Sequence, residues 1–467
     1  MKNTVIKCLS ALFFTFWFLS TGFAQRNFVM VHGLGGGLRS QAPYANLFAT
    51  RRDANGNATV NPINFEHNSA DGIVAAATDA TTKTIGLSSG RSAAARSNDI
   101  GIGHSMGGLT VREMDRQAVN TNQPKMFGGF IITGPPIHGS RLPTSFQDGS
   151  VGVFFHGLCK EVVADPLFSL GGLLSNWFGN ILNFLYDWDS EICDLLFKLV
   201  QKSETFKGFQ TQSINDFSIN ANYLDNPTTG INSFTSTTHK VCFQGNENGP
   251  VHWRLFSSFM KTPNDGTLHN GDHDQIGVNF MNTVENIELF TGIAASSMAI
   301  GCLFDPATWE YVYPLGKIGY EFFDGYTWLQ QSESQFNTMI GAFGSFQELQ
   351  EINIFDCYGE RASLESRYQN GQITMIQYWS GVSALYQNPN CSRNVRIPVT
   401  VPLNGESDGV VPLKSQRLEG AAANVIVEGV NHFELRDHPK MTVEYNSLFE
   451  GRTPMNDPAA KQFFITQ

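Results

Sequence analysis

Residues 99–119 combine a short apolar run, a glycine-flanked serine and a helix-like tract, an order that few folds accommodate. The sequence of residues 101–110 is GIGHSMGGLT, in which Gly103 and Gly107 lie two residues before and after Ser105. Glycine relieves crowding where a backbone turns sharply. We therefore predict a β-strand that ends in a tight turn holding Ser105, with a helix directly after the turn.

A second stretch has the same spacing. Gly86-Leu87-Ser88-Ser89-Gly90 also matches Gly-x-Ser-x-Gly, and in a chain with 45 glycines among 467 residues chance alone predicts roughly a third of a match. Only two residues, Thr84-Ile85, lead into this stretch, and they belong to an alanine- and threonine-rich tract typical of a helix. The context therefore favours Ser105 over Ser88.

Strand-like runs alternate with helix-like tracts near both ends of the chain. The predicted strands, each with the loop that follows it, are residues 26–37, 58–65, 99–105, 125–140, 394–412 and 424–439. Helices are expected near residues 43–50, at 70–86 and after Ser105, and the last predicted strand and loop are followed by a terminal helix or a tail. Such alternation is typical of a mostly parallel sheet with helices on both faces, so we expect an α/β fold.

A serine is a weak nucleophile unless a base, itself held by an acid, takes its proton. Where a serine lies in a strand–turn–helix unit, the acid and then the base follow it along the chain. This order excludes His32, His104 and His138 as the base. Asp408, in GESDGVVP, follows one predicted strand, and His432, in GVNHFEL, follows the next.

Two neighbours of these residues are alternatives. Glu406 lies two residues from Asp408 in the same loop, and His438 is a second histidine after the last strand. We favour His432 because it comes directly after a strand, whereas His438 precedes Pro439 and suits the start of the next element. The negative charge that develops on a substrate carbonyl needs fixed donors, for which we expect the backbone N–H groups of Met106 and Leu34.

The segments FVMVHGLGG, GHSMGGL, DGVVP and VNHFEL, in this order, resemble the α/β-hydrolase superfamily and, within it, bacterial secreted lipases and esterases. The resemblance covers residues 25–140 and 394–467. IITGPPIHGS is similar to the lipase segment that follows the strand after the serine, but departs from it at residues 134–138. The resemblance implies an α/β-hydrolase fold that hydrolyses carboxylic esters through Ser105, His432 and Asp408 and an acyl-enzyme. It also implies that the two leading antiparallel strands of larger members are absent.

Residues 141–393 differ in character, and we interpret them as a large, mainly helical lid or cap insertion. The chain has 37 phenylalanines, and the twenty residues 167–186 carry no charge. Their asparagines, serines and glycines favour an amphipathic helix pair over a membrane span. An apolar cover favours medium or long acyl chains as substrate. The alternative is a cap with its own core and no role in substrate choice.

Residues 1–24 have the pattern of a secretory signal, with two lysines, an apolar stretch and a small-x-small site at Gly22-Phe23-Ala24. Its removal leaves 29 basic and 42 acidic residues, a net charge of −13, which disfavours nucleic acid and anionic membranes as partners. We expect a secreted or periplasmic protein without a stable transmembrane segment. The six remaining cysteines favour disulfides in such a compartment.

No cofactor and no metal are expected. His269, Asp272, His273 and Asp274 gather in LHNGDHDQ, but adjacent side chains of one loop rarely reach a single ion, so a solvated turn is favoured. The functional hypothesis is a secreted serine hydrolase that acts on a lipid or other ester, with a lipid–water interface as a candidate place of action. Alternatives are a phospholipase, thioesterase or acyltransferase with the same three residues, or a non-catalytic binding protein of the same fold.

Overall fold

The structure is a computed structural model. It describes residues 26–34, 36–51, 58–88, 92–96, 98–123, 125–159, 212–226, 228–247, 289, 291–299, 312–452 and 455–465. The predicted signal, the uncharged segment 167–186 and the histidine–aspartate turn at 268–275 lie outside the described residues.

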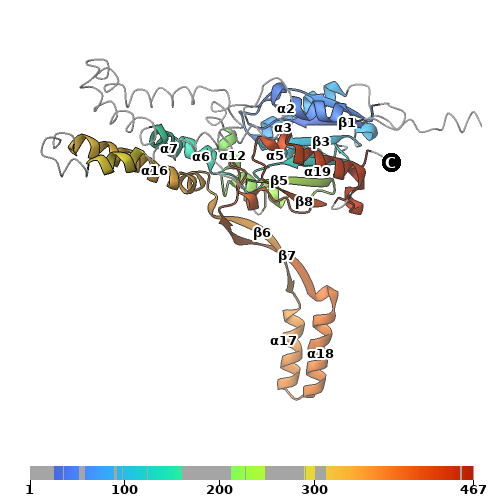
Figure 1. Ribbon diagram of the computed structural model, residues 1–467. Coiled ribbons are helices and arrows are strands. Elements are labelled where there is room, and N and C mark those ends of the chain that lie inside the picture. The colour runs from blue at the N-terminus through green and yellow to red at the C-terminus, as the bar shows by residue number, and fades with distance from the viewer. Residues whose placement is uncertain are drawn as a thin grey trace, which may run out of the picture.

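A six-stranded sheet forms the centre of the fold (Figure 1). Its strands, in spatial order, are β2 (Val60–Asn64), β1 (Arg26–Val31), β3 (Ile100–His104), β4 (Gly129–Thr133), β5 (His239–Asn246) and β8 (Ala423–Glu428). All five neighbouring pairs are parallel. After β2 is added on one side of β1, the chain places β3 on the other side, so the order reverses between β1 and β3. Such a switch point is where α/β sheets bind ligands at the carboxyl ends of their strands.

Helices cover both faces of this sheet because successive residues of its strands are apolar on both sides. Val29 and Val31 of β1 pack with α3 (Ile73–Leu87) and α5 (Met106–Asn120). Phe28 and Met30, which alternate with them, pack with α2 (Leu38–Ala49) and α19 (Pro439–Glu450). A strand that is buried on both faces is expected of a parallel sheet between helices. The α/β fold class is confirmed.

The interpretation of residues 141–393 as one continuous insertion is wrong at β5, because this strand lies inside the main sheet between β4 and β8. Its sequence, HKVCFQGN, contains polar residues that obscure a buried strand. Gln244 and Asn246 are nevertheless buried, and Asn246 Nδ2 donates to Glu428 Oε2 over 2.9 Å. Before and after β5, α6 (Leu142–Gln147), α7 (Ser150–Cys159) and α16 (Val312–Met339) share a separate apolar cluster.

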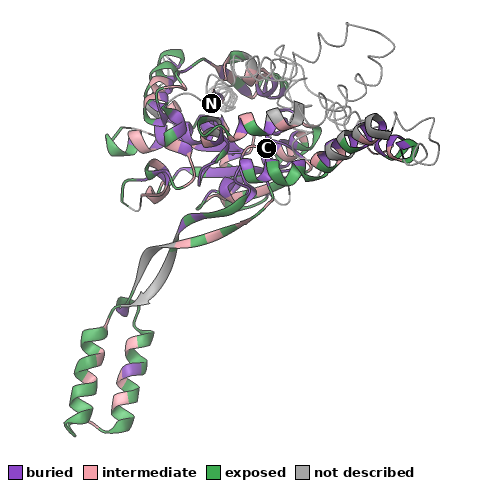
Figure 2. Ribbon diagram, turned by 90° about the vertical axis from the view of Figure 1, so that its left-hand side faces the viewer, coloured by how far each residue is buried: buried purple, intermediate pink, exposed green. Residues whose placement is uncertain are grey.

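A long two-stranded arm leaves the body of the molecule (Figures 1 and 2). β6 (Phe343–Phe355) and β7 (Ser392–Asn404) pair antiparallel along their whole length, and α17 (Tyr358–Gln369) and α18 (Met375–Gln387) form a helical hairpin at the far end. The expectation that residues 394–404 form a strand of the core is therefore wrong: they are a strand, but their partner is β6. Strand-like composition does not tell with which strand a segment pairs.

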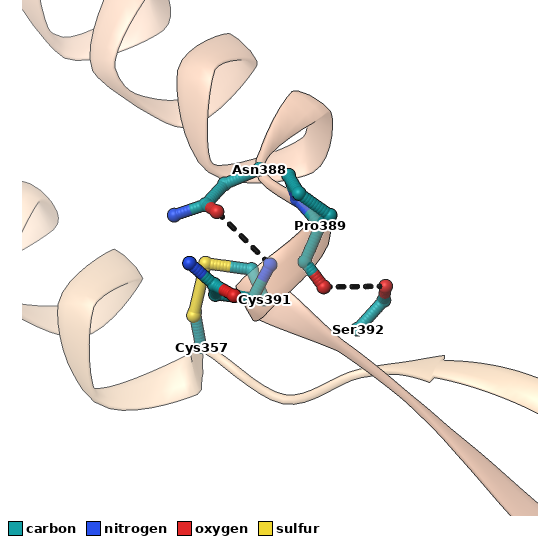
Figure 3. The surroundings of a disulfide bond; sticks show 6 residues. Cys357, Asn388, Pro389, Cys391 and Ser392 are labelled. Atoms are coloured by element: carbon teal, nitrogen blue, oxygen red, sulfur yellow. Dashed lines mark hydrogen bonds between the residues drawn. A yellow bond between two sulfur atoms is a disulfide. The ribbon is translucent and has the colours of Figure 1, made fainter.

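A disulfide between Cys357 and Cys391 closes the helical hairpin where it joins the ribbon (Figure 3). The backbone N–H of Asp356 donates to the carbonyl of Cys391 over 2.8 Å, which continues the ladder up to the disulfide. A disulfide that closes a loop of this length, 34 residues, lowers the conformational entropy of the unfolded chain. In the chain-entropy model this loss stabilises the folded hairpin by about 4 kcal/mol. The hairpin is thus held by a covalent link where it lacks a core.

Complete pairing of the six cysteines is excluded by Cys242, a buried free thiol in β5. Its Sγ–H donates to the carbonyl of Gln416 over 3.2 Å, and burial raises its pKa. This cysteine behaves as a small apolar residue with one weak hydrogen bond.

The remaining short elements lie in the connections. They are α4 (Ala93–Arg96), α12 (Ser213–Phe217), α13 (Asn222–Asp225) and the 3₁₀ helices Ile231–Ser233, Pro389–Cys391, Leu413–Gln416, Glu434–Arg436 and Pro458–Phe463. Over the described part of the chain, no helix has both the length and the apolar character that crossing a membrane requires.

Candidate active site

Ser105 lies between the end of β3 and the start of α5 with φ 57° and ψ −131°. A non-glycine residue rarely has positive φ, and such strain persists only where the surroundings impose it. Here the Ser105 N–H donates to the carbonyl of Thr133 on β4 over 2.9 Å, and the Ser105 carbonyl accepts from Gly108 N over 2.9 Å. The sharp strand–turn–helix predicted from the sequence is therefore present, with Ser105 at its apex.

The flanking glycines are required by the close approach of three backbone segments. A Cβ on Gly103 would lie 2.4 Å from the carbonyl oxygen of Gly107, and a Cβ on Gly107 would lie 2.2 Å from that of Val31. The turn after β1 also touches the serine, since a Cβ on Gly33 would lie 2.9 Å from Cβ of Ser105. The competing Ser88 is the C-cap of α3 with φ −94°, so its motif forms a helix end and no such turn.

Asp408 and His432 are hydrogen-bonded to each other. His432 Nδ1 lies 2.7 Å from Asp408 Oδ2, and the carboxylate is fully buried. The other oxygen, Oδ1, accepts from the backbone N–H groups of Val410 (3.0 Å) and Val411 (2.7 Å). Glu406, the alternative acid, is exposed, and its Oε2 accepts from Asn404 Nδ2 instead. Of the two carboxylates in this loop, only Asp408 can orient the histidine.

The backbone of His432 is held at both ends. Its N–H donates to the carbonyl of Asp408 over 2.8 Å, and its carbonyl accepts from Nε2 of His104 over 2.8 Å. Because a carbonyl only accepts, Nε2 of His104 carries a proton, and burial lowers the pKa of His104 well below its usual range. His104 is therefore a neutral positioning group. The order along the chain excludes His104 as the base, but nothing local in the sequence indicates its contact with residue 432.

A reciprocal hydrogen-bond pair stabilises the loop around His432. The N–H of Asn431 donates to Glu434 Oε2 (3.0 Å), and the N–H of Glu434 donates to Asn431 Oδ1 (3.2 Å). The alternative base, His438, lies at the N-cap of α19, where its Nδ1 accepts from Lys440 N. His438 thus begins the last helix, as its position before proline indicates.

The segment Thr133-Gly134 joins the serine to the Asp408–His432 pair. The Thr133 carbonyl accepts from Ser105 N, and at the next residue a Cβ on Gly134 would lie 3.1 Å from both Asp408 Oδ2 and His432 Nδ1. On the other side, the ring of His104 lies 4.8 Å from that of His432, measured between centroids. The three predicted residues are thus gathered at the carboxyl edge of β3, β4 and β8.

The turn after β1 has a fixed peptide orientation. His32 Nδ1 lies 2.8 Å from the carbonyl oxygen of Gly33, which makes Nδ1 the donor. The Gly33 carbonyl and the Leu34 N–H belong to one trans peptide and point in opposite directions, so the Leu34 N–H is directed away from His32. Met106 begins α5, and the first N–H groups of a helix have no acceptor within it. Of the two expected donors, Met106 follows Ser105 directly, and Leu34 follows Gly33, where a Cβ would lie 2.9 Å from Cβ of Ser105.

His67 braces this turn from the far side. Its backbone N–H donates to Nε2 of His32 over 3.2 Å, and the two rings stack with centroids 3.8 Å apart. Burial lowers the pKa of His67 to about 3, and among the described residues neither of its ring nitrogens has a hydrogen-bond partner. His32 and His67 are thus a neutral pair at the sequence-predicted donor turn. In the residues that the structure describes, no group of three or more histidine, cysteine, aspartate or glutamate side chains is arranged to hold a metal ion.

The sheet order, the strand–serine–helix turn and the acid and histidine after later strands define an α/β-hydrolase fold. No protein-family model and no curated protein matches the sequence. Among solved structures, the mature lipase BlEst2 of Bacillus licheniformis matches at 18% identity over 52% of this chain and 76% of that chain, with a TM-score of 0.25. Est816, described as an N-acyl homoserine lactone degrading enzyme, matches at 15% identity over 47% and 74%, with a TM-score of 0.25. An extracellular α/β-hydrolase of a Paenibacillus species matches at 12% identity over 47% and 76%, with a TM-score of 0.24.

Proposed function

We propose that the protein is a secreted serine hydrolase of carboxylic esters that uses Ser105, His432 and Asp408. The observation that carries this proposal is the strained backbone of Ser105 beside a buried, hydrogen-bonded acid–histidine pair. Strain of this kind costs about 1–3 kcal/mol and is concentrated at active sites. A serine in an ordinary glycine-rich turn needs neither the strain nor the pair.

In the proposed reaction, the hydrogen bond from Nδ1 to Asp408 leaves Nε2 of His432 as the nitrogen that takes the proton of Ser105. Ser105 Oγ attacks the ester carbonyl, and the N–H groups of Leu34 and Met106 stabilise the oxyanion, about 3 kcal/mol for each donor. His432 then gives its proton to the leaving alcohol. Water activated by the same histidine hydrolyses the acyl-enzyme and regenerates Ser105.

The apolar surroundings of the acid and the base support acyl chains as substrates. Val410 follows Asp408 by two residues and Phe433 follows His432 directly, and both pack against the apolar cluster of α6, α7 and α16. Trp328 and Phe154 bring aromatic surface into the same cluster, with ring centroids 5.5 Å apart. These helices fit the role of the cover predicted from the sequence, and medium or long acyl chains are the substrates that such a cover would select.

Export is part of the proposal. It is supported by the signal-like pattern of residues 1–24 and by the disulfide between Cys357 and Cys391, since disulfides persist in oxidising compartments.

Hydrolysis of p-nitrophenyl esters from acetate to palmitate tests the function, with Ser105→Ala as the inactive variant and Ser88→Ala as the matched serine of the other motif. We expect a rate that is greatest for long chains, is lost in Ser105→Ala and is retained in Ser88→Ala. A fluorophosphonate should label the wild type and Ser88→Ala but not Ser105→Ala. If the rate is greatest on the acetate ester, the esterase activity stands, but the proposal that the cover binds long acyl chains is overturned. Turnover independent of Ser105 would overturn the proposal.

A further inference from the structure

The far end of the arm exposes a group of aromatic and apolar side chains. They surround the turn between α17 and α18, and we call them the tip cluster: Tyr368, Met375, Ile376, Tyr378 and Trp379. The side chains of Met375, Ile376 and Trp379 are 59%, 79% and 57% exposed. Tyr378 links the group, since its ring stacks on Tyr368 at 5.3 Å and meets Trp379 edge-on at 5.2 Å. Figure 2 shows this exposed end far from the body.

The most exposed members of the tip cluster, Met375, Ile376 and Trp379, are not needed to pack the hairpin. α17 has no buried residue and α18 has one, Val382. The two helices meet at the Tyr368–Tyr378 stack and where Leu364 faces Gly381, since a Cβ on the glycine would lie 3.0 Å from Leu364 Cδ1. Arg361 Nη1 also donates to the Tyr386 hydroxyl over 3.0 Å. Trp379 and Ile376 remain outside these contacts. Contiguous exposed apolar groups that are rimmed by polar residues mark sites of interaction.

The charge of the tip indicates which surface it contacts. Residues 368–391 contain no aspartate, glutamate, lysine or arginine, and their polar residues are glutamine, asparagine, serine and threonine. Tyrosine and tryptophan beside uncharged polar groups suit the boundary between lipid and water. A basic segment would be needed to attract an anionic membrane, and the whole chain has a net charge of −11. The charge pattern therefore matches an uncharged or zwitterionic interface.

The size of the tip cluster argues against a protein partner. A stable protein interface takes roughly 20–30 residues from each side, whereas the tip cluster has five. A few apolar side chains suffice at a lipid surface because each is buried independently as it inserts. We infer that the tip cluster inserts into an uncharged or zwitterionic lipid–water interface and tethers the enzyme there. Only the purpose of the tether rests on the proposed function, since insertion does not involve Ser105.

Flotation with phosphatidylcholine vesicles, with and without phosphatidylglycerol, tests this inference on the full chain. The tip variant is Ile376→Ser with Trp379→Ser, and the control is Val74→Ser with Val443→Ser, two comparably exposed valines on α3 and α19. We expect the wild type and the control to bind phosphatidylcholine, the tip variant to bind at least tenfold more weakly, and phosphatidylglycerol not to strengthen binding. Equal binding of both variants would overturn the inference, as would binding that requires phosphatidylglycerol.

A second measurement localises the insertion. Brominated phosphatidylcholine should quench tryptophan emission of the wild type, and Trp379→Phe should lose that component while still floating with vesicles. Full quenching in Trp379→Phe would place the contact elsewhere and overturn the inference. So would a wild type that ignores vesicles but self-associates in sedimentation through Trp379, which would make the tip an interface between copies.

The two proposals fail separately. Hydrolysis of dissolved p-nitrophenyl butyrate should be unchanged in the tip variant, which also shows that the body is folded. Vesicle binding without any Ser105-dependent hydrolysis would remove the proposed function and leave the tether. Ser105-dependent hydrolysis without vesicle binding would overturn the tether and leave the proposed function.

Discussion

His432 and Asp408 are joined twice, once through their side chains and once through their backbones. The side-chain hydrogen bond spans 2.7 Å from Nδ1 to Oδ2, and the backbone hydrogen bond spans 2.8 Å from the N–H of His432 to the carbonyl of Asp408. The acid therefore determines both the tautomer of the imidazole and the position of the residue that carries it.

Replacing the side chain of Asp408 should separate these two effects, because the backbone hydrogen bond to His432 is retained. We expect Asp408→Asn to lower kcat on a soluble ester by on the order of 10³–10⁴-fold, because the amide no longer favours a proton on Nδ1. Glu406→Gln, two residues away in the same loop, should leave kcat within about twofold, since that carboxylate is exposed and bonded to Asn404. Equal effects of the two substitutions would refute the assignment of the acid.

The two Gly-x-Ser-x-Gly motifs offer a matched pair of glycines. Gly103→Ala should prevent the turn at Ser105 from forming, because the new Cβ would lie 2.4 Å from a backbone oxygen. Gly86→Ala should stabilise the protein by about 0.5–1 kcal/mol, since Gly86 is inside α3 and a Cβ there meets nothing within 4 Å. Urea unfolding measures the stability of both variants, and hydrolysis of a soluble ester measures their activity. An active, stable Gly103→Ala protein would contradict this account of the turn.

The donor turn should depend on His32. His32→Ala removes one of the two hydrogen bonds to the Gly33 carbonyl and leaves the one from the Gly36 N–H (3.1 Å). The peptide that carries the Leu34 N–H is then held less firmly, so we expect kcat to fall roughly 10–100-fold with KM little changed. His32→Asn retains a donor near the same carbonyl and should recover part of the loss. A change confined to KM, or no difference between the variants, would assign His32 a structural role only.

Stability should fall on acidification because buried neutral histidines must become protonated. Burial lowers the pKa of His67 from 6.5 to about 3. The unfolded chain therefore binds the proton first, and stability present above pH 6.5 is lost as the pH falls toward 3, at up to about 1.4 kcal/mol per pH unit. His67→Phe should make this dependence shallower between pH 6.5 and 4.5. Urea titrations at several pH values measure it, and an unchanged slope would show that His67 does not contribute.

The disulfide should protect the helical hairpin and leave the body unaffected. With both Cys357→Ser and Cys391→Ser, we expect proteolysis within residues 358–390 to be at least tenfold faster, because the link contributes about 4 kcal/mol in the chain-entropy model. Hydrolysis of a soluble ester and the main unfolding transition should be unchanged. Loss of activity on the soluble ester would show that the arm supports the active site.

The features that the sequence predicts well are local. The turn at Ser105 follows from two glycines and the strand and helix beside them, and the loops of Asp408 and His432 follow directly from apolar runs. The structure differs from the sequence-based expectation where contacts between distant segments determine which strands pair. β5 joins the sheet despite its polar residues because β4 and β8 flank it, and β7 pairs with β6 because the chain returns beside it. The roles of His32 and His104 depend on contacts with residues 67 and 432, which no local pattern indicates.

The register of β6 and β7 allows the arm to be shortened or lengthened without a change at its base. β6 begins at Phe343 and β7 ends at its register partner, Asn404, so the chain leaves and re-enters the body at one point. Thirteen residue pairs at about 3.3 Å each give the ribbon a reach of roughly 40 Å. Deleting two residues from each strand would shorten that reach by about 7 Å and keep every remaining side chain on its own face. The distance between the tip cluster and the body of the molecule can thus be changed in steps of two residue pairs. The loop of Asp408, which lies four residues beyond the end of β7, keeps its position.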